Sequence, residues 1–438
     1  MIEALIRALF VAPLPVLAWW LRQRTESWFS PAALFAAWWS VAMGGPLIAA
    51  PDFDVWLPAV LVAVIFVALF SLAAIAGERS ARVAWGGEQP PRRLSMRVLR
   101  ATVAAGAVLG VVSIQALVAV HGKSLRDLLD LATWIELGAQ FSISRYIDDV
   151  DEPLLARLLS IGFFSGSLIG GVLWVRACSR LDRILALAPL VTALLYASVL
   201  TTRAVFLYAV MMFGAVQFAM RVYDGQHMRR LLHGRLILAV GLGLAFLVIL
   251  VALLQTSRAG YDTLDQMADT INHIRVWFCG HISGFSAWYR EYVLVDEPLH
   301  GGERTLGGLF QLLGLMERRR GVFVDYHSIG AGEVTNVYTI FRGLLEDFGL
   351  AGSVMLLIAL GWGAGTLYVA ALRKRLAAVA ALALVYCVLL WSPFGSFMTY
   401  NTLLFSYVVF GLVLHLAARP ASKGTAVAPA PDPRSCSP

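Results

Sequence analysis

Four arginines in this sequence have the chemistry to bind phosphate groups. Arg203 follows two threonines in a short polar turn between apolar segments, and Arg258, Arg304 and Arg342 lie in one long polar stretch. A guanidinium group binds phosphate oxygens through two parallel hydrogen bonds, and its charge stabilises a leaving diphosphate. We therefore expect these four residues to hold a diphosphate. The alternatives are a reach to lipid head groups for Arg203 and a solvated face for the run Arg318–Arg320.

Three further residues could take a proton from a hydroxyl group. They are His327, Glu333 and Asp347. A neutral imidazole or a carboxylate does this when it lies within hydrogen-bond reach of the hydroxyl. Asp347 has an alternative role, because a carboxylate at the N-terminal end of a membrane span favours the helix dipole.

The acidic and histidine residues give little indication of a metal site. Four histidines lie between residues 255 and 346, and their spacing matches no zinc signature. Asp52 with Asp54, like Asp149 with Asp151, has the D-x-D form that can hold a divalent ion against a diphosphate. We favour the alternative that both are short polar loops or helix caps. We therefore expect no metal and no other cofactor.

The long polar stretch also carries an amphipathic pattern. Apolar residues recur at three- and four-residue steps, which predicts a helix: Leu264, Met267, Ile271, Ile274, Phe278, Ile282 and Phe285. Aromatic residues gather along the same segment: Trp277, Phe278, Phe285, Trp288, Tyr289 and Tyr292. They could anchor the helix at a membrane surface or form an apolar platform for sugar rings or a polyprenyl chain.

The composition indicates which class of protein carries these residues. Of the 438 residues, 59% are hydrophobic and only 14% are charged, whereas a soluble domain carries about 25% charged residues. A water-soluble fold cannot bury so much apolar side chain. Soluble enzymes, DNA-binding factors and secreted disulfide scaffolds are therefore excluded, and we expect membrane lipid, and no nucleic acid, as a partner.

Eleven segments are apolar enough to cross a membrane, which takes roughly 20 residues each. They are 5–21, 32–50, 56–76, 98–120, 155–178, 184–201, 204–220, 236–254, 349–371, 377–395 and 397–417. The sequence therefore predicts an all-α polytopic membrane protein with about eleven transmembrane helices.

Positive charges predict the orientation of these spans. Arginine and lysine clusters fall on alternate sides of successive spans, and such clusters mark the cytoplasmic side. This places the C-terminus in the cytoplasm and the N-terminus outside. We expect four regions: spans one to eight in 1–254 with a small external loop at 121–153, a large external loop with amphipathic helices at 255–346, spans nine to eleven in 347–417, and a disordered cytoplasmic tail at 418–438.

The small external loop has a signal for a helix start. Ser124 followed by Asp127 has the form of a capping box, and apolar residues at helical spacing come next. We therefore expect a surface helix that begins at this pair of residues.

The segment from Thr335 to Gly352 reads TNVYTIFRGLLEDFGLAG. It resembles the TNxYT…DFGxxG signature of the bacterial O-antigen and oligosaccharide repeat-unit polymerases, the Wzy family. The turn Thr201–Ala204 is similar to that family's S/T-R-A/G turn, and Gly301–Leu306 resembles its G-x-x-T segment. The chain length, the number of spans and one long loop near the C-terminus also fit.

The resemblance implies a GT-C-like fold and glycosyl transfer at the periplasmic face of the bacterial inner membrane. A growing glycan would move from undecaprenyl diphosphate to the non-reducing end of an incoming lipid-linked unit. The partners would be undecaprenyl-diphosphate-linked glycans, with a chain-length regulator and a flippase as further candidates. In this scheme the four arginines hold the diphosphate, His327, Glu333 and Asp347 are candidate bases, and three residues bind sugar: Asn336, Tyr338 and Arg290.

Two alternative functions remain open. A lipid-linked oligosaccharide flippase is one, although transporters tend to carry ionisable residues at mid-membrane and these spans hold few. A related O-antigen ligase or a metal-dependent glycosyltransferase acting through Asp52 and Asp54 is the other. The ligases carry a histidine immediately before the asparagine that matches Asn336, and this chain has Thr335 there. That departure argues against a ligase and leaves the base unassigned.

Overall fold

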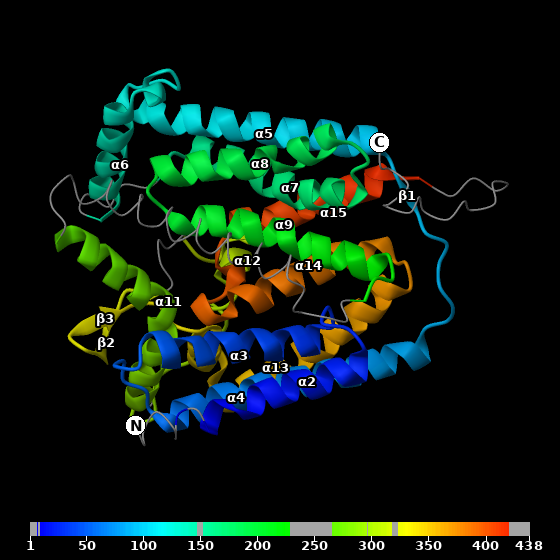
Figure 1. Cartoon of the computed structure of the whole chain (residues 1–438), viewed down its shortest axis with the longest axis vertical. Coiled ribbons are helices and arrows are strands. Elements are labelled where there is room, and N and C mark those ends of the chain that lie inside the picture. Colours follow the sequence, from blue (N-terminus) through cyan, green and yellow to red (C-terminus); the bar gives the residue numbers. More distant parts are fainter. Residues whose placement is uncertain are drawn as a thin grey trace. The chain divides into compact units, whose positions relative to one another are not determined.

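The computed structural model describes residues 7, 9–146, 152–227, 265–295, 297–317 and 323–419 (Figure 1). α-Helices dominate these residues: α2 (Pro13–Thr25), α3 (Pro31–Ala49), α4 (Leu57–Ala84), α5 (Met96–Val118), α6 (Leu131–Tyr146), α7 (Leu154–Arg176), α8 (Arg180–Val199), α9 (Arg203–Tyr223), α11 (Asp265–Tyr292), α12 (Gly307–Leu312), α13 (Ile340–Leu372), α14 (Leu376–Trp391) and α15 (Asn401–Ala417). The strands are short and form two antiparallel pairs, β1 (Arg93–Leu94) with β4 (Ala418–Arg419) and β2 (His327–Gly330) with β3 (Glu333–Thr335).

Within the described residues, eight helices are long and apolar enough to cross a membrane. They are α3, α4, α5, α7, α8, α9, α13 and α14 with the turn that follows it. Eight of the eleven predicted spans therefore exist as long apolar helices, and the chain has the helices of a multi-pass membrane protein.

The other three predicted spans differ from the expectation. The first predicted span is described only in part: residues 9–11 are helical, and α2 follows with 13 residues from Pro13, where proline fits the first turn of a helix. The last span is α15, which begins at Asn401 and has 17 residues. The eighth predicted span, 236–254, lies outside the described residues.

The chain divides into two compact units. The first comprises residues 1–86, 227–369 and 385–404, and the second comprises 87–226, 370–384 and 405–438. In the first unit a hydrophobic core is centred on Phe341, which is fully buried. The Phe341 ring stacks on Trp39 at 4.6 Å between centroids and meets Phe66 edge-on at 5.3 Å. This core fixes the start of α13, where Arg342 lies.

Helix α13 begins earlier than expected and bends. It starts at Ile340 and continues to Leu372, with non-helical backbone at Gly349. The φ angle of Gly349 is +63°, a conformation that favours glycine because it has no Cβ atom. Asp347 lies two residues before this bend, at the N-terminal end of the apolar span, as the alternative interpretation of this residue expected.

Helices α4 and α13 approach each other closely through glycines. A Cβ atom built on Gly365 would overlap the carbonyl oxygen of Ala74, and one built on Gly77 would overlap the carbonyl oxygen of Trp362. In membrane proteins small residues allow this approach, which strengthens dispersion contacts between helix backbones. The bend at Gly349 and this seam together fix the direction of α13.

The β2–β3 hairpin carries His327 at one end and Glu333 at the other. His327 pairs with Thr335 in the ladder, and the turn uses positive φ angles at Gly330, Ala331 and Gly332. The Asp54 amide donates a hydrogen bond to the Ile329 carbonyl at 2.7 Å, and Ile329 is fully buried. The hairpin is therefore attached to the loop between α3 and α4.

In the second unit, α5 packs against α7 through a glycine-rich surface, since a Cβ atom on Gly106 would crowd the carbonyl oxygen of Gly162. Asp182 near the start of α8 forms a two-point ion pair with Arg100 on α5, at 2.6 and 3.0 Å. The predicted polar turn is present, because α8 ends at Val199 and α9 begins at Arg203.

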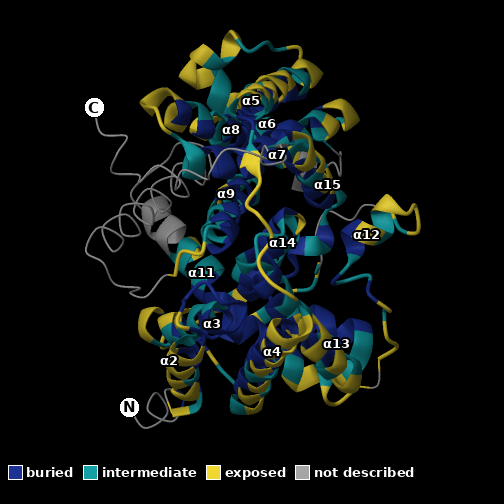
Figure 2. Ribbon diagram, turned by 90° about the vertical axis from the view of Figure 1, so that its right-hand side faces the viewer, coloured by how far each residue is buried: buried dark blue, intermediate teal, exposed yellow. Residues whose placement is uncertain are grey.

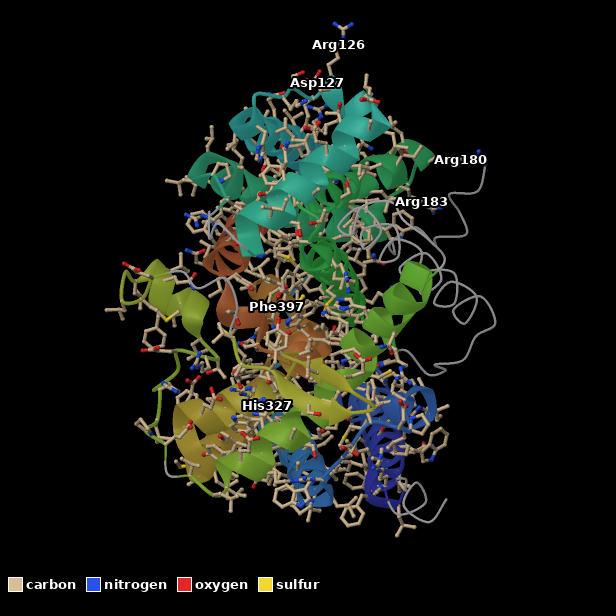
Figure 3. All side chains as sticks on the ribbon, turned by 90° about the vertical axis from the view of Figure 1, so that its left-hand side faces the viewer. Arg126, Asp127, Arg180, Arg183, His327 and Phe397 are labelled. Atoms are coloured by element: carbon tan, nitrogen blue, oxygen red, sulfur yellow. The ribbon has the colours of Figure 1, made fainter. Side chains whose placement is uncertain are left out.

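The predicted capping-box contact between Ser124 and Asp127 is present, but the surface helix expected to begin there starts later in the chain. The Asp127 carboxylate accepts hydrogen bonds from the Ser124 amide and hydroxyl at 2.7 and 2.9 Å, and this closes a 3₁₀ turn at the tip of the connection (Figure 3). The helix begins only at Leu131, after Asp130, whose carboxylate accepts from the Thr133 amide at 3.2 Å. Asp130 is therefore the residue that caps α6.

We predict that Gly365→Ala destabilises the protein, because the added methyl group overlaps the backbone of α4. Such overpacking typically costs about 1–3 kcal/mol. Gly363→Ala is the matched control, since nothing lies within 4 Å of a Cβ atom there. The measurement is thermal unfolding of the detergent-purified protein. Equal midpoints for the two variants would show that the seam is not tightly packed.

Candidate functional site

Arg342 lies at the centre of a polar cluster in the first unit. Its side chain is buried and its nitrogen atoms face two carboxylates. Nε donates to Glu346 Oε1 at 2.7 Å, one helical turn further along α13. Nη1 and Nη2 face the two carboxylate oxygens of Asp325 at 2.8 and 3.0 Å. Nη2 donates a hydrogen bond to Asp325, and Nη1 adds an ion-pair contact with the same carboxylate.

Aromatic rings surround the same guanidinium group. Its central carbon lies 4.0 Å from the Phe323 ring centroid, 4.1 Å from that of Tyr338 and 5.1 Å from that of Trp288. A cation over an aromatic face is attracted by the ring, more strongly when water is excluded. Arg342 thus joins α11, α13 and the segment around residue 325.

Arg304 reaches the cluster from the opposite side of Glu346. Its Nε lies 3.2 Å from Glu346 Oε2, so one buried carboxylate bridges two arginines. The backbone of Arg304 is held by Asp347, which accepts from the Arg304 amide at 3.0 Å. Asp347 also accepts from the amide and the hydroxyl of Thr305, at 2.7 and 2.5 Å. Asp347 therefore fixes the loop that presents Arg304.

His327 lies at the partly exposed edge of the cluster. Its side chain is 11% exposed, and its Nε2 lies 3.2 Å from Glu291 Oε2. On the other side of the ring, Nδ1 lies 2.6 Å from the Tyr338 hydroxyl and 3.4 Å from Asp325 Oδ2. The imidazole is therefore held in one orientation between two carboxylates and a tyrosine.

Electrostatics explain the roles of Asp325 and Tyr338. Burial alone would raise the pKa of Asp325, but the hydrogen bond and the charge of Arg342 outweigh it and lower that pKa below its ordinary value. Burial raises the pKa of Tyr338 well above its ordinary value. Asp325 is thus a carboxylate at neutral pH, and Tyr338 keeps its proton, which it can donate to the Asp325 carbonyl at 2.9 Å.

Two other predicted site residues of the first unit, Glu333 and Arg290, have printed contacts with residues outside this cluster. Glu333, at the far end of the hairpin, accepts a hydrogen bond from Asn272 on α11. The Arg290 guanidinium lies on an exposed part of α11, 5.9 Å from the Trp56 ring centroid, and Asn336 is half-buried after β3. Arg203 is a buried residue at the start of α9, in the second unit. Arg258 and the run Arg318–Arg320 lie outside the described residues.

The aromatic residues of α11 divide into two groups. Phe285 and Trp288 are buried in the core of the first unit, which neither the membrane-anchor nor the sugar-platform interpretation anticipated. Tyr289 and Tyr292 are half-buried and stack with each other at 6.1 Å between centroids. This second pair packs against the buried one, since Tyr292 stacks on Trp288 at 4.7 Å between centroids.

Sequence reasoning missed three carboxylates of the cluster: Asp325, Glu346 and Glu291. A signal existed for Glu346, because it follows Arg342 by four residues and such pairs meet on one helix face. No local pattern marks the other two. The cluster thus combines two guanidinium groups, Arg304 and Arg342, with four carboxylates, since Asp347 also belongs to it.

The acidic pairs give no metal site in the part of the chain that the structure describes. No group of three or more His, Cys, Asp or Glu side chains is placed there to hold an ion. Both carboxylate oxygens of Asp52 face Arg275, each at 2.9 Å. Asp149 and Asp151 lie outside the described residues.

No protein-family model, no curated protein and no solved structure was found to match this chain. The cluster is therefore interpreted from its own residues and geometry.

We predict that Arg342→Gln destabilises the protein by about 3 kcal/mol, because the buried Glu346 carboxylate keeps the more exposed Arg304 as a counter-charge but loses its hydrogen-bonded partner. The Glu346 side chain is 4% exposed and has no water to replace the guanidinium, whereas Asp325 at 41% is partly solvated. Arg290→Gln is the control and should cost at most about 1 kcal/mol. Thermal unfolding in detergent measures both.

The double variant Arg342→Gln with Glu346→Gln shows how much of the destabilisation comes from the Glu346 charge and how much from the other contacts of Arg342. It should recover part of the lost stability, since a neutral amide no longer needs a counter-charge. Equal stability of the Arg342 and Arg290 single variants would mean that the ion pairs contribute nothing to folding.

Proposed function

We propose that this protein is a membrane glycosyltransferase that polymerises undecaprenyl-diphosphate-linked oligosaccharide repeat units. The growing glycan would pass from its lipid carrier to the non-reducing end of an incoming lipid-linked unit. The observation that carries the proposal is the cluster of His327, Arg342, Asp325 and Glu346. It is formed by the segment that resembles the repeat-unit polymerases, together with the end of the large loop before it.

His327 is the base in this proposal. A proton must leave the attacking sugar hydroxyl, and an imidazole oriented by a carboxylate performs this task in many enzymes. Asp325 and Tyr338 hold Nδ1, which leaves Nε2 and the exposed Glu291 side chain toward the open edge. An incoming hydroxyl would displace the exposed Glu291 carboxylate from its position 3.2 Å from Nε2 and take its place there.

The hairpin register gives further support to this assignment. The related ligases carry a histidine where this chain has Thr335, and that substitution had left the base unassigned. In the structure His327 pairs with Thr335 across the ladder. An imidazole is therefore available next to this position, although it comes from the other strand.

The diphosphate needs cations beyond this cluster. Because carboxylates outnumber guanidinium groups around Arg342, the cluster itself would not attract an anion strongly. We therefore propose that Arg342 mainly orders Asp325 and Glu346. Arg304 at the edge, with Arg258, would bind the diphosphate and stabilise the charge that grows on it as the sugar leaves.

The remaining residues would bind the sugars. Asn336 and Arg290 would donate hydrogen bonds to sugar hydroxyls, and the half-buried Tyr289 and Tyr292 would offer ring faces. Tyr338 is buried, and its hydroxyl faces His327 and backbone carbonyl groups. Its proposed role is therefore to orient the base rather than to touch the sugar.

The proposed setting is the bacterial inner membrane. We propose a GT-C-like protein of about eleven spans in which residues 255–346 form a periplasmic loop that carries the active site. No ATP is available on that side, so the donor must bring its own leaving group, and polyprenyl diphosphate does so. A chain-length regulator and a flippase are proposed partners.

We predict that a strain lacking this protein makes surface polysaccharide with a single repeat unit and no ladder on a gel. This result follows because export and attachment would continue without polymerisation. Complete loss of the polysaccharide, with lipid-linked units trapped inside the cell, would instead indicate a flippase.

A chelator tests the metal-dependent alternative. Loss of polymerisation activity in membranes treated with chelator, restored by a divalent ion, would favour that alternative.

We predict that His327→Ala lowers the polymerisation rate by about 10²–10⁴-fold, the usual contribution of a general base. Glu333→Gln is the matched comparison on the same hairpin and should retain most of the rate, because Glu333 is engaged with Asn272. The measurement is ladder formation by membranes supplied with lipid-linked repeat units, at equal protein levels. If both variants polymerise at the full rate, neither residue is the base.

A further inference from the structure

A short apolar helix in the large loop exposes several leucines. Residues 306–316 read LGGLFQLLGLM and contain no charged side chain. Within them α12 spans Gly307–Leu312. The exposed fractions are 41% for Leu309, 43% for Leu312, 63% for Leu313 and 67% for Leu315. Figure 2 shows this exposure at the end of α12. Water is an unfavourable environment for such a cluster.

The backbone conformation at the end of α12 keeps these leucines exposed. Gly314 has a φ of +69°, and it ends the helix in the manner of a Schellman motif. The Leu315 amide donates to the Phe310 carbonyl at 2.9 Å, and the Gly314 amide to the Gln311 carbonyl at 3.2 Å. The leucines are therefore held outward by a hydrogen-bonded turn.

The opposite side of α12 covers an irregular segment. A Cβ atom on Gly308 would lie 2.7 Å from the Met398 carbonyl oxygen, so only glycine allows this approach. The Gln311 side-chain amide donates to the Thr399 carbonyl at 3.4 Å. The covered segment, Phe397–Thr399, is a single 3₁₀ turn that leads into α15.

The length of α15 indicates how deep in the bilayer the turn Phe397–Thr399 lies. Its 17 residues span about 25 Å at roughly 1.5 Å per residue, which is less than the hydrocarbon thickness of about 30 Å. The turn before α15 would then lie within the apolar part of the bilayer. Non-helical backbone is tolerated there only when protein covers it, and α12 provides that cover.

The leucines also continue an apolar surface of the same unit. Phe310 of α12 lies close to Gly302, which also adjoins Phe348 of α13. Directly after Phe348 comes the bend of α13, followed by the exposed side chains of Leu350 and Met355 at 56% and 67%. In a membrane-spanning helix these side chains face lipid, so α12 adjoins a lipid-facing surface.

We propose that α12 is a re-entrant element whose leucines Leu309, Leu312, Leu313 and Leu315 lie in the hydrocarbon of the bilayer. Its glycine side covers the break before α15. The occupant of the leucine surface is bilayer lipid, because the segment is uncharged, adjoins lipid-facing residues and covers a break in a span. The inference does not depend on the proposed function.

Site-directed fluorescence in lipid vesicles tests this proposal. Cys178 and Cys436 are replaced by serine, and the buried Cys279 and Cys387 remain. The variant Leu313→Cys is labelled with the environment-sensitive dye NBD, with Leu315→Cys as a second position. Met355→Cys is the lipid-facing control. Val334→Cys is the aqueous control, because Val334 is 53% exposed on the β2–β3 hairpin.

We expect the dye at Leu313 to behave like the dye at Met355. Its emission should be shifted to the blue, quenched by spin-labelled lipids and insensitive to iodide in the buffer. Quenching by iodide as strong as at Val334 would overturn the proposal, since α12 would then lie in water. Insensitivity to both quenchers would also overturn it, because another protein surface or a second copy would then cover the leucines.

Discussion

The guanidinium group of Arg342 is the constraint on which the polar half of the first unit depends. A buried cation is tolerated only when charge and hydrogen bonds compensate it. Asp325 and Glu346 supply both, and Phe323, Tyr338 and Trp288 supply ring faces. These partners come from three separate segments. The contacts that compensate the charge of Arg342 therefore hold α11, α13 and the hairpin segment together.

The same constraint creates an oriented imidazole at the edge of the cluster. Asp325 serves two partners, since its carboxylate pairs with Arg342 and also lies 3.4 Å from the ring of His327. Tyr338 lies against both the guanidinium and the imidazole. Holding the arginine therefore also holds the histidine, which connects the stability of this region with the chemistry proposed for it.

The apolar helices are held together by a different kind of contact. Its helices approach through glycines, as Gly365 does against Ala74 and Gly308 against Met398. Neither contact would be possible with a side chain in place of glycine. Close backbone packing of this kind suits a bilayer, where the hydrophobic effect does not drive helices together. The contact between Gly308 and Met398 in turn lets α12 cover the turn before the short helix α15.

Local patterns in the sequence were sufficient to predict many of the helices. Eight predicted spans and the α8–α9 turn are present as expected, because apolar length and periodicity are properties of neighbouring residues. The amphipathic segment is likewise α11. The sequence also selected Arg304, Arg342 and His327 as residues of interest, and these lie in one cluster.

The pairing of those residues became clear from the three-dimensional structure alone. It placed Glu333 at the opposite end of the hairpin from His327, assigned Asp347 to the loop that presents Arg304, and brought in Asp325, which no pattern marked. It also moved the cap of α6 from Ser124 to Asp130. The physical reason is that hydrogen bonds and ion pairs depend on distance through space, and a carboxylate in the sequence does not indicate which donor it will meet.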